Sequence, residues 1–304
     1  MMRALYLSTA RAADVNTKLV LFAATNQLLT SVGDVASTAA AGSPGAASVE
    51  GLDVFLHVHD NCRSTFLYHA QRMYGAAVAV SPTLHMDVIP IRTEVPLSTA
   101  QASDGEADDP ELLKALYVAA TEGFSAARQG APIECYTADA MRAAAAAGGF
   151  NPVYKYVAVG GTFDHLHAGH KLLLTTAALH ATEKLRCGIT GDELLVKKKF
   201  AEKLQPIEER TKAAESFLRR IRPDLTLELA AISDVSGGTD TIPDVEALTV
   251  SPETERSLSI INDLRAKNGG LAPLVGVPIP YVTAPDGRVI SSTEIRQRSV
   301  EAVQ

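Results

Sequence analysis

The second half of the chain alternates short apolar runs with segments whose apolar residues recur at helical spacing. The run 156–159 leads into a glycine-rich turn, and the segment 171–185 that follows has the period of a helix. Four further apolar runs favour strands, at Leu185–Thr190, Thr226–Ala231, Ala247–Val250 and Val277–Val282. This alternation predicts an α/β fold with a parallel, Rossmann-like sheet and right-handed crossovers.

Proline and serine mark where the helices of this half begin and end. Pro206 stands at a favoured first helical position, and Pro223 ends the same segment. Ser251 has the pattern of an N-cap. Ser291, with Glu294 three residues later, predicts a capping box for a last helix.

The first half alternates less regularly. Helices are expected near Val15–Val32, over Pro110–Arg128 and over Ala138–Ala147, and strands at Asp53–His59, Met86–Ile91 and Ile133–Thr137. The stretches 37–48 and 98–110 are rich in small and acidic residues and are predicted as surface loops. We therefore expect a smaller α/β domain at residues 1–150 and a second domain at residues 151–304.

Composition narrows the class of protein. The 304 residues are 46% hydrophobic, and no apolar run approaches the length of a membrane span. A net charge of −7 argues against nucleic-acid binding. Charge is uneven, however, because residues 197–222 hold nine basic and four acidic residues. We expect part of this basic stretch to serve anionic ligands.

The expected location is the cytoplasm. Three widely spaced cysteines, Cys62, Cys135 and Cys187, favour a reducing compartment over a disulfide framework. The first residues include basic side chains and no acid before Asp14, which leaves mitochondrial import as the alternative.

The strongest candidate chemistry is the stretch GGTFDHLHAGH, residues 160–170. Glycines between a strand and a helix let the backbone approach a ligand, and the helix start attracts an anion. His167 and His170 lie three apart and can project from the first helical turn toward that anion. Gly169 between them leaves room for a nucleotide.

A metal is the alternative use of these histidines. No cysteine or acid stands nearby at a zinc-like spacing, and Asp164, the nearest candidate, could equally cap the helix. A second group, interpreted as structural for its place on a strand and the following loop, comprises His57, His59, Asp60 and His69. No metal site is expected in the chain.

Two motifs together resemble a known family of nucleotidyltransferases. Its signatures are G-x-F-D-x-x-H-x-G-H and I-S-S-T-x-x-R, and the second occurs here as residues 290–296. The phrases DELLVKKKF, QPIEERTKAAESFL and TVSPETERSLSIINDLR lie between them. Over residues 154–298 the chain is most similar to the eukaryotic and archaeal type of phosphopantetheine adenylyltransferase, the domain that precedes a kinase in bifunctional coenzyme A synthase.

The resemblance implies transfer of an adenylyl group from ATP to 4′-phosphopantetheine, giving dephospho-coenzyme A and pyrophosphate. Mg²⁺ would accompany ATP, held chiefly by phosphate oxygens and water. No G-x-x-x-x-G-K-[ST] occurs in the sequence, so a separate dephospho-coenzyme A kinase is implied. The alternatives are another enzyme of this superfamily, of cytidylyltransferase or nicotinamide mononucleotide adenylyltransferase type, and a non-catalytic nucleotide-binding scaffold.

The resemblance also assigns residues. The catalytic positions are His170, His167, Thr162 and Lys198. The ATP-binding positions are Gly160, Gly161, Phe163, His167, Gly169, His170, Arg256, Ser291, Ser292, Thr293 and Arg296. The phosphopantetheine-binding positions are Thr162 and the lysines Lys197, Lys198 and Lys199, among which spacing alone does not choose.

One assigned position departs from the family pattern. Relatives carry a Tyr-Arg-Gly-Gly type of phrase where this chain has Glu255, Arg256, Ser257 and Leu258. Side chains therefore replace glycines near the expected nucleotide, which puts the role of Arg256 in question.

Overall fold

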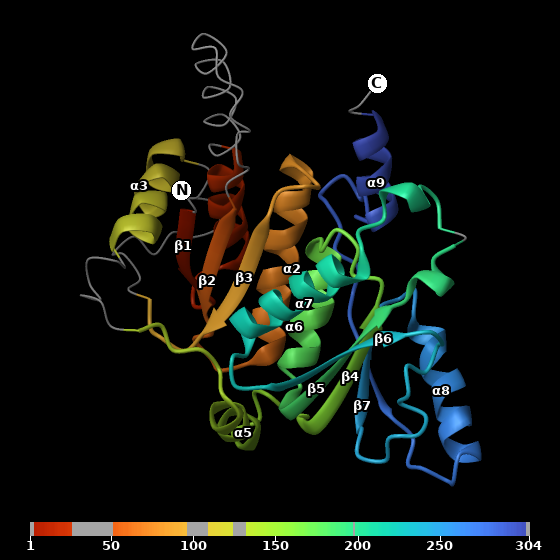
Figure 1. The fold of residues 1–304 in the computed structure, drawn as a ribbon. Coiled ribbons are helices and arrows are strands. Elements are labelled where there is room, and N and C mark those ends of the chain that lie inside the picture. The colour runs from red at the N-terminus through yellow and green to blue at the C-terminus, as the bar shows by residue number, and fades with distance from the viewer. Residues whose placement is uncertain (1–2, 26–50, 96–108, 124–131, 197, 302–304) are drawn as a thin grey trace. The chain divides into compact units, whose positions relative to one another are not determined.

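The computed structural model describes residues 3–25, 51–95, 109–123, 132–196 and 198–301. They form two compact units, each built on its own parallel sheet (Figure 1). The first unit comprises residues 1–60, 65–134 and 283–288, and the second comprises residues 61–64, 135–282 and 289–304. Helix α5 (Ala138–Ala146) belongs to the second unit, although it precedes the division expected at residue 150.

The first unit contains a three-stranded parallel sheet in the order β1-β2-β3. Its strands are β1 (Arg3–Ser8), β2 (Leu52–His57) and β3 (Met86–Ile91). Most residues of β2 and all of β3 are buried, as expected of parallel strands covered on both faces. Strand β1 lies within the basic segment at the start of the chain.

The helices of the first unit follow the sequence pattern in part. Residues 13–25 are helical, and the rest of the helix expected to Val32 lies outside the described residues. Helix α2 spans Arg63–Val80, and α3 spans Pro110–Val118 with Asp109 as its N-cap. A π-helical turn, η2 (Ala119–Gly123), then replaces the α-helix expected to continue toward Arg128. The loop stretches 37–48 and 98–108 lie outside the described residues.

The second unit contains a five-stranded sheet in the order β6-β5-β4-β7-β8, with every neighbouring pair parallel. Its strands are β4 (Tyr154–Gly161), β5 (Ala181–Thr190), β6 (Thr226–Ile232), β7 (Ala247–Val250) and β8 (Val275–Pro278). The chain moves outward from β4 in one direction through β5 and β6, and then in the other through β7 and β8. The carboxyl ends of β4 and β7 therefore border a topological switch point, where ligands of such folds bind.

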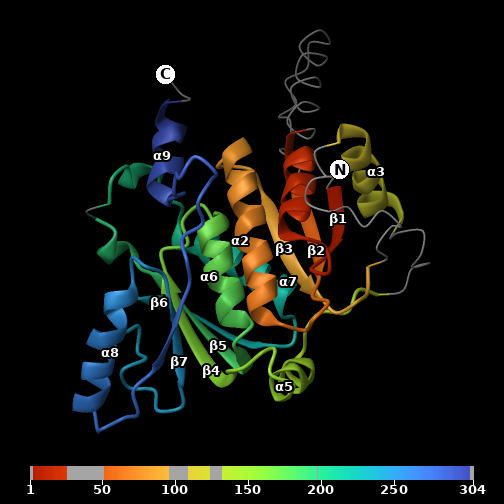
Figure 2. The same cartoon turned by 180° about the vertical axis from the view of Figure 1, so that it is seen from behind.

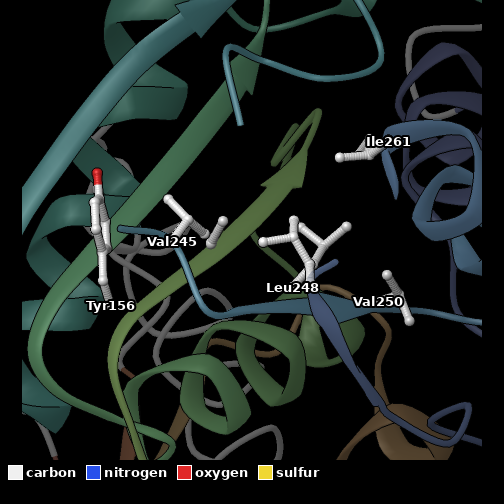
Figure 3. Close-up of a cluster of buried hydrophobic side chains, with 7 residues drawn as sticks. Tyr156, Val245, Leu248, Val250 and Ile261 are labelled. Carbon is white, nitrogen blue, oxygen red and sulfur yellow. The ribbon is translucent and has the colours of Figure 1, made fainter. Parts of the chain in front are cut away.

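Helices cover both faces of this sheet. Helices α6 (Ala168–Ala178) and α7 (Ile207–Ile221) pack against each other, and α6 lies along β4, β5 and β7 (Figure 2). Helix α8 (Glu255–Lys267) packs on β7, and α9 (Ser292–Glu301) follows last. The side chains of Tyr156, Leu248 and Ile261 join one buried apolar cluster beside α8 (Figure 3). Because strand side chains alternate, Val157 and Val159 face the other way, into the buried layer beneath α6.

Three predicted elements are wrong in detail. Residues 133–137 form only a single bridge at Cys135, and not a strand. Ser251 does not cap α8, because its N–H instead donates to the Thr254 hydroxyl (2.9 Å) and the helix begins at Glu255. The last strand is shifted to Val275–Pro278, since Pro278 and Pro280 remove the N–H groups that would extend it.

Among the described residues, no helix has both the length and the apolar content needed to cross a lipid bilayer.

Candidate active site

A cavity of about 280 Å³ opens at the carboxyl ends of β4 and β7 in the second unit. It is lined by both sequence motifs and by the loop after β7. From the first motif come Gly160, Gly161, Thr162, His167, Gly169 and His170, and from the last come Ile290, Ser291, Ser292, Thr293 and Arg296. Residues about 120 positions apart in the sequence thus meet at the topological switch point of the sheet.

The turn between β4 and α6 is tightly folded. Phe163 has a positive φ of 51° and is fully buried, and His165 has a φ of 45°. Gly161 fits closely here, because a Cβ on it would lie 3.1 Å from the Phe163 ring. Phe163 therefore acts through its ring as a packing residue under the turn, and its contact with ATP stays a prediction.

His167 caps helix α6. Its Nδ1 accepts a hydrogen bond from the Gly169 N–H (3.2 Å), so Nε2 carries the ring proton. Asp164 is not the cap, contrary to one of the sequence interpretations. A Cβ on Gly169 would lie 3.2 Å from the His167 ring, so this glycine makes room for the capping imidazole. Gly169 also lines the cavity, and its contact with a nucleotide stays a prediction.

The two histidines are stacked and electrically neutral at pH 7. Their ring centroids lie 3.8 Å apart at an interplanar angle of 20°. Burial lowers the pKa of His167 to about 4, although nearby Asp164 opposes the shift. Burial, together with His167 and Lys198, lowers the pKa of His170 well below its usual value.

His170 has a ring nitrogen without a partner. Its Nδ1 is buried and forms no hydrogen bond within the described part of the chain. Leaving such a group unsatisfied costs about 1–3 kcal/mol, and native proteins rarely tolerate it outside functional sites. The imidazole of His170 also lines the cavity.

A buried ion pair joins the first motif to the last. The Asp164 carboxylate is fully buried and accepts a hydrogen bond from Arg296 Nη1 at 2.5 Å. Arg296 also donates to the Lys199 carbonyl (3.2 Å) and the Thr293 hydroxyl (3.2 Å). This guanidinium lines the cavity, but all three of its nitrogens are engaged by protein acceptors. Its contact with ATP stays a prediction, and its observed role is to join the turn after β4 and the segment at Lys199 to helix α9.

The hydroxyls of the last motif are at the start of α9. Ser291 Oγ accepts the Glu294 N–H (3.3 Å), as the capping-box pattern predicts. Ser292 donates to the Asp164 carbonyl (3.0 Å). Ser291, Ser292 and Thr293 all line the cavity, so helix-start donors and hydroxyls face the same space as the histidines.

Of the three adjacent lysines, Lys198 lines the cavity. Lys199 contributes its carbonyl to Arg296, and Lys197 lies outside the described residues. Lys198 also lies close enough to His170 to lower its pKa. The choice of Lys198 is supported by this placement.

Comparison with known proteins agrees with the geometry. Residues 158–298 match the family described as cytidylyltransferase-like. A phosphopantetheine adenylyltransferase from Methanopyrus kandleri is 38% identical over 143 residues, which are 47% of this chain and 89% of that protein. The chain belongs to the phosphopantetheine adenylyltransferase family.

Two further similarities were found. A phosphopantetheine adenylyltransferase from Saccharomyces cerevisiae is 38% identical over 151 residues, so the match spans about half of each chain (47% and 48%). A crystal structure of a protein of unknown function from Archaeoglobus fulgidus shows 29% identity and covers 41% of this chain and 88% of that one, with a TM-score of 0.37.

The departure from the family pattern at Arg256 has a structural counterpart. Arg256 is exposed on α8. It lines neither this cavity nor a second, adjoining cavity that is described below. Thr254 and Ser257, on either side of it, do line cavity walls. The structure therefore does not bring Arg256 together with the other predicted ATP-binding residues.

A second cavity of about 200 Å³ adjoins the first. The two share Gly160, Gly161, Thr190 and Thr254. The second extends over β5 and β6, and its lining includes Arg186, Leu194, Ile232, Val235 and Gly237. The glycines of the family motif thus lie where two ligand-sized spaces meet.

Two features of the site were missed in the sequence. One is the ion pair of Asp164 and Arg296, which are 132 residues apart and carry no local signal of pairing. The other is Arg210, a fully buried arginine that binds the carbonyls of Thr162 and Thr190. Its place in the phrase QPIEERTKAAESFL was the only available hint.

The histidines of the first unit are engaged within the protein. Ser8 Oγ lies 3.3 Å from His57 Nδ1, and Asn16 Nδ2 lies 3.2 Å from His69 Nδ1. Burial lowers the pKa of both histidines. No cluster of three or more potential metal ligands was found among the residues that the structure describes.

Proposed function

We propose that the second unit transfers the adenylyl group of ATP to 4′-phosphopantetheine, releasing pyrophosphate and dephospho-coenzyme A. The observation that carries the proposal is the pair of adjoining cavities that meet at the family's glycines. Two spaces on either side of one phosphate cradle suit two substrates that must bring two phosphates together. The match to the Methanopyrus kandleri protein over 89% of its length supports the choice of substrates.

The cavity lined by His170 and Ser291 would hold the triphosphate of ATP. Helix-start N–H groups and hydroxyls suit phosphate oxygens, and anions are stabilised there by the helix dipole. The neighbouring cavity, with Leu194, Ile232 and Val235 on its wall, would receive the largely apolar pantetheine arm. Thr162, Lys197, Lys198 and Lys199 remain the proposed contacts of the acceptor phosphate.

No general base is required in this reaction. The attacking group is a phosphate oxygen that is already anionic, and it displaces pyrophosphate from the α-phosphorus. Catalysis then depends on aligning the two phosphates and stabilising the charge that develops on the α-phosphoryl group. A neutral His170 would donate an N–H to that charge, and Lys198 would supply the cation between the two anions.

Magnesium would be carried in on the triphosphate and would neutralise part of its charge. The hydroxyls and backbone groups around the cavity suit such a complex, since Mg²⁺ keeps phosphate oxygens and water as its main ligands. We further propose that a dephospho-coenzyme A kinase acts on the product.

Pyrophosphate release tests the proposal directly. The full chain is incubated with ATP and Mg²⁺ and one of three acceptors: 4′-phosphopantetheine, pantetheine without its phosphate, or nicotinamide mononucleotide. A fourth reaction pairs CTP with glycerol 3-phosphate. We expect release with 4′-phosphopantetheine alone. Release only with nicotinamide mononucleotide would show that the acceptor is a different phosphate, and release only with CTP and glycerol 3-phosphate would show that both the nucleotide and the acceptor differ. No release in any reaction would favour a nucleotide-binding scaffold.

A further inference from the structure

Arg210 is a buried cation beneath the phosphate cradle to which the proposed reaction gives no role. It lies in the first turn of α7 and is 0% exposed. Its Nη1 donates to the carbonyl oxygens of Thr162 (2.9 Å) and Thr190 (2.7 Å). Its Nε donates to the Gln205 carbonyl (2.9 Å), and its Nη2 donates to Asp192 Oδ1 (2.9 Å).

This position is costly for a positive charge. The start of a helix carries the positive end of its dipole and disfavours a cation. Full burial adds a desolvation penalty of several kcal/mol, which Asp192 offsets only in part because its side chain is 79% exposed. A residue that served only to pack the first turn of α7 could be apolar at lower cost.

The carbonyl groups that Arg210 binds explain why a cation is needed. Thr162 and Thr190 follow or end β4 and β5, and both residues line the cavity. Carbonyl oxygens at the carboxyl edge of a parallel sheet carry partial negative charge where two phosphates are expected to bind. We propose that Arg210 is a positioning residue that neutralises these two carbonyls and keeps the floor of the cradle favourable for anions.

The same helix provides a matched control. Arg222, at the other end of α7, is also 0% exposed and also donates Nη1 to two carbonyls, those of Ala178 (3.1 Å) and Ala181 (2.9 Å). It likewise pairs with one acid, Asp224 (2.8 Å). Its carbonyls lie at the end of α6 and the start of β5, and Arg222 lines neither of the two cavities.

The test compares the binding of an anionic and a neutral ligand to full-length Arg210→Met and Arg222→Met. Titration calorimetry measures the affinity for pyrophosphate with Mg²⁺, and equilibrium dialysis measures the affinity for adenosine. Both variants should lose stability. Only Arg210→Met should bind pyrophosphate more weakly, by at least about tenfold, the scale of one lost charge-assisted interaction, while its adenosine affinity stays within about twofold of wild type.

A smaller loss of pyrophosphate affinity in folded Arg210→Met, or an equal loss in Arg222→Met or for adenosine, would overturn the proposal. If Arg210→Met does not fold, the pyrophosphate affinity of Arg210→Lys tests the proposal, because this variant keeps the positive charge and loses the forked geometry of the guanidinium. Pyrophosphate affinity within about fivefold of wild type would support the proposal, and a larger loss would contradict it.

The inference rests on the proposed function only in that the cradle binds phosphates. Its test needs no acceptor, so a wrong acceptor would show separately as missing turnover in the wild-type chain.

Discussion

At the scale of single residues, the turn between β4 and α6 and its surroundings hold two electrically neutral imidazoles, and the positive charge comes from other side chains. Burial keeps His167 and His170 unprotonated at pH 7, while Lys198 at the wall and Arg210 beneath the floor supply positive charge. A neutral imidazole donates a hydrogen bond without the cost of a second buried cation. Charge development in the reaction can then be met by fixed donors, which need no rearrangement as the reaction proceeds.

Replacing His170 should therefore slow turnover without unfolding the chain. We expect His170→Ala to lose on the order of a hundredfold in kcat, about 2.7 kcal/mol, which is the scale of one lost donor to a developing oxyanion. Steady-state pyrophosphate release measures it. His180→Asn is the control, because His180 is also buried, with its pKa lowered to about 4, but lines neither cavity. Near-normal kcat in His170→Ala would remove this residue from the mechanism.

The ion pair between the two motifs makes a prediction about stability. Asp164→Asn leaves the buried Arg296 guanidinium without its counter-charge, so the free energy of unfolding should fall by about 3–5 kcal/mol. Urea denaturation measures the change. Asp139→Asn, which breaks the exposed pair with Arg142, should cost no more than about 1 kcal/mol. Equal losses in the two variants would mean that the Asp164 pair contributes no more than a surface contact.

Residues of the site could be predicted from the sequence where the signal is local. The motif placed His167, His170 and the hydroxyls of residues 291–293 correctly around one cavity. Sequence reasoning did not pair Asp164 with Arg296, because their pairing depends on how α9 returns to the first motif. One sequence contains no trace of such a contact.

At the scale of secondary-structure elements, periodicity located strands better than it located helix ends. Strand β7 begins and ends as predicted, and β3 does too. The helix expected to reach Leu185 ends at Ala178, because the apolar residues that follow fit a strand equally well and Ala181–Thr190 finds partners in the sheet. The strand expected at residues 133–137 does not form, because only Cys135 pairs with another strand-like residue, as a single bridge.

The cap of α6 should make part of the stability depend on pH. His167 has a folded pKa of about 4, below its ordinary value, because protonation is opposed by burial and would also remove the Nδ1 acceptor of the Gly169 N–H. The unfolded chain therefore binds more protons between about pH 6.5 and pH 4, and stability falls as pH falls through that window. His167→Asn keeps a capping side chain that does not titrate.

Urea denaturation of wild type and of His167→Asn, at pH 7 and at pH 5, measures this effect. Wild type should lose more stability than His167→Asn between these two values. Parallel losses would show that the imidazole of His167 does not titrate differently in the folded and unfolded chains.

At the scale of the whole molecule, the two units are interleaved in sequence. Residues 61–64 are part of the second unit, and Arg63 Nη1 donates to the carbonyls of Phe150 (3.0 Å) and Leu179 (3.0 Å). The Tyr136 hydroxyl donates to Asn61 Oδ1 (2.9 Å). No sequence pattern indicated this, because the segment lies within what reads as a separate domain. A division drawn at one point of the chain would thus remove contacts within the second unit.

This interleaving predicts how a fragment should behave. Residues 135–304 retain both motifs and both cavities, so the fragment should release pyrophosphate with a kcat within about tenfold of the full chain. Its melting temperature should nevertheless be lower by several degrees, because the loss of Arg63 leaves two buried carbonyls unsatisfied, at about 1–3 kcal/mol each. Arg63→Met in the full chain should reproduce part of that loss with normal turnover. A fragment as stable as the full chain would contradict the structural role of residues 61–64. A folded but inactive fragment would show that the first unit or residues 61–64 supply something the reaction requires.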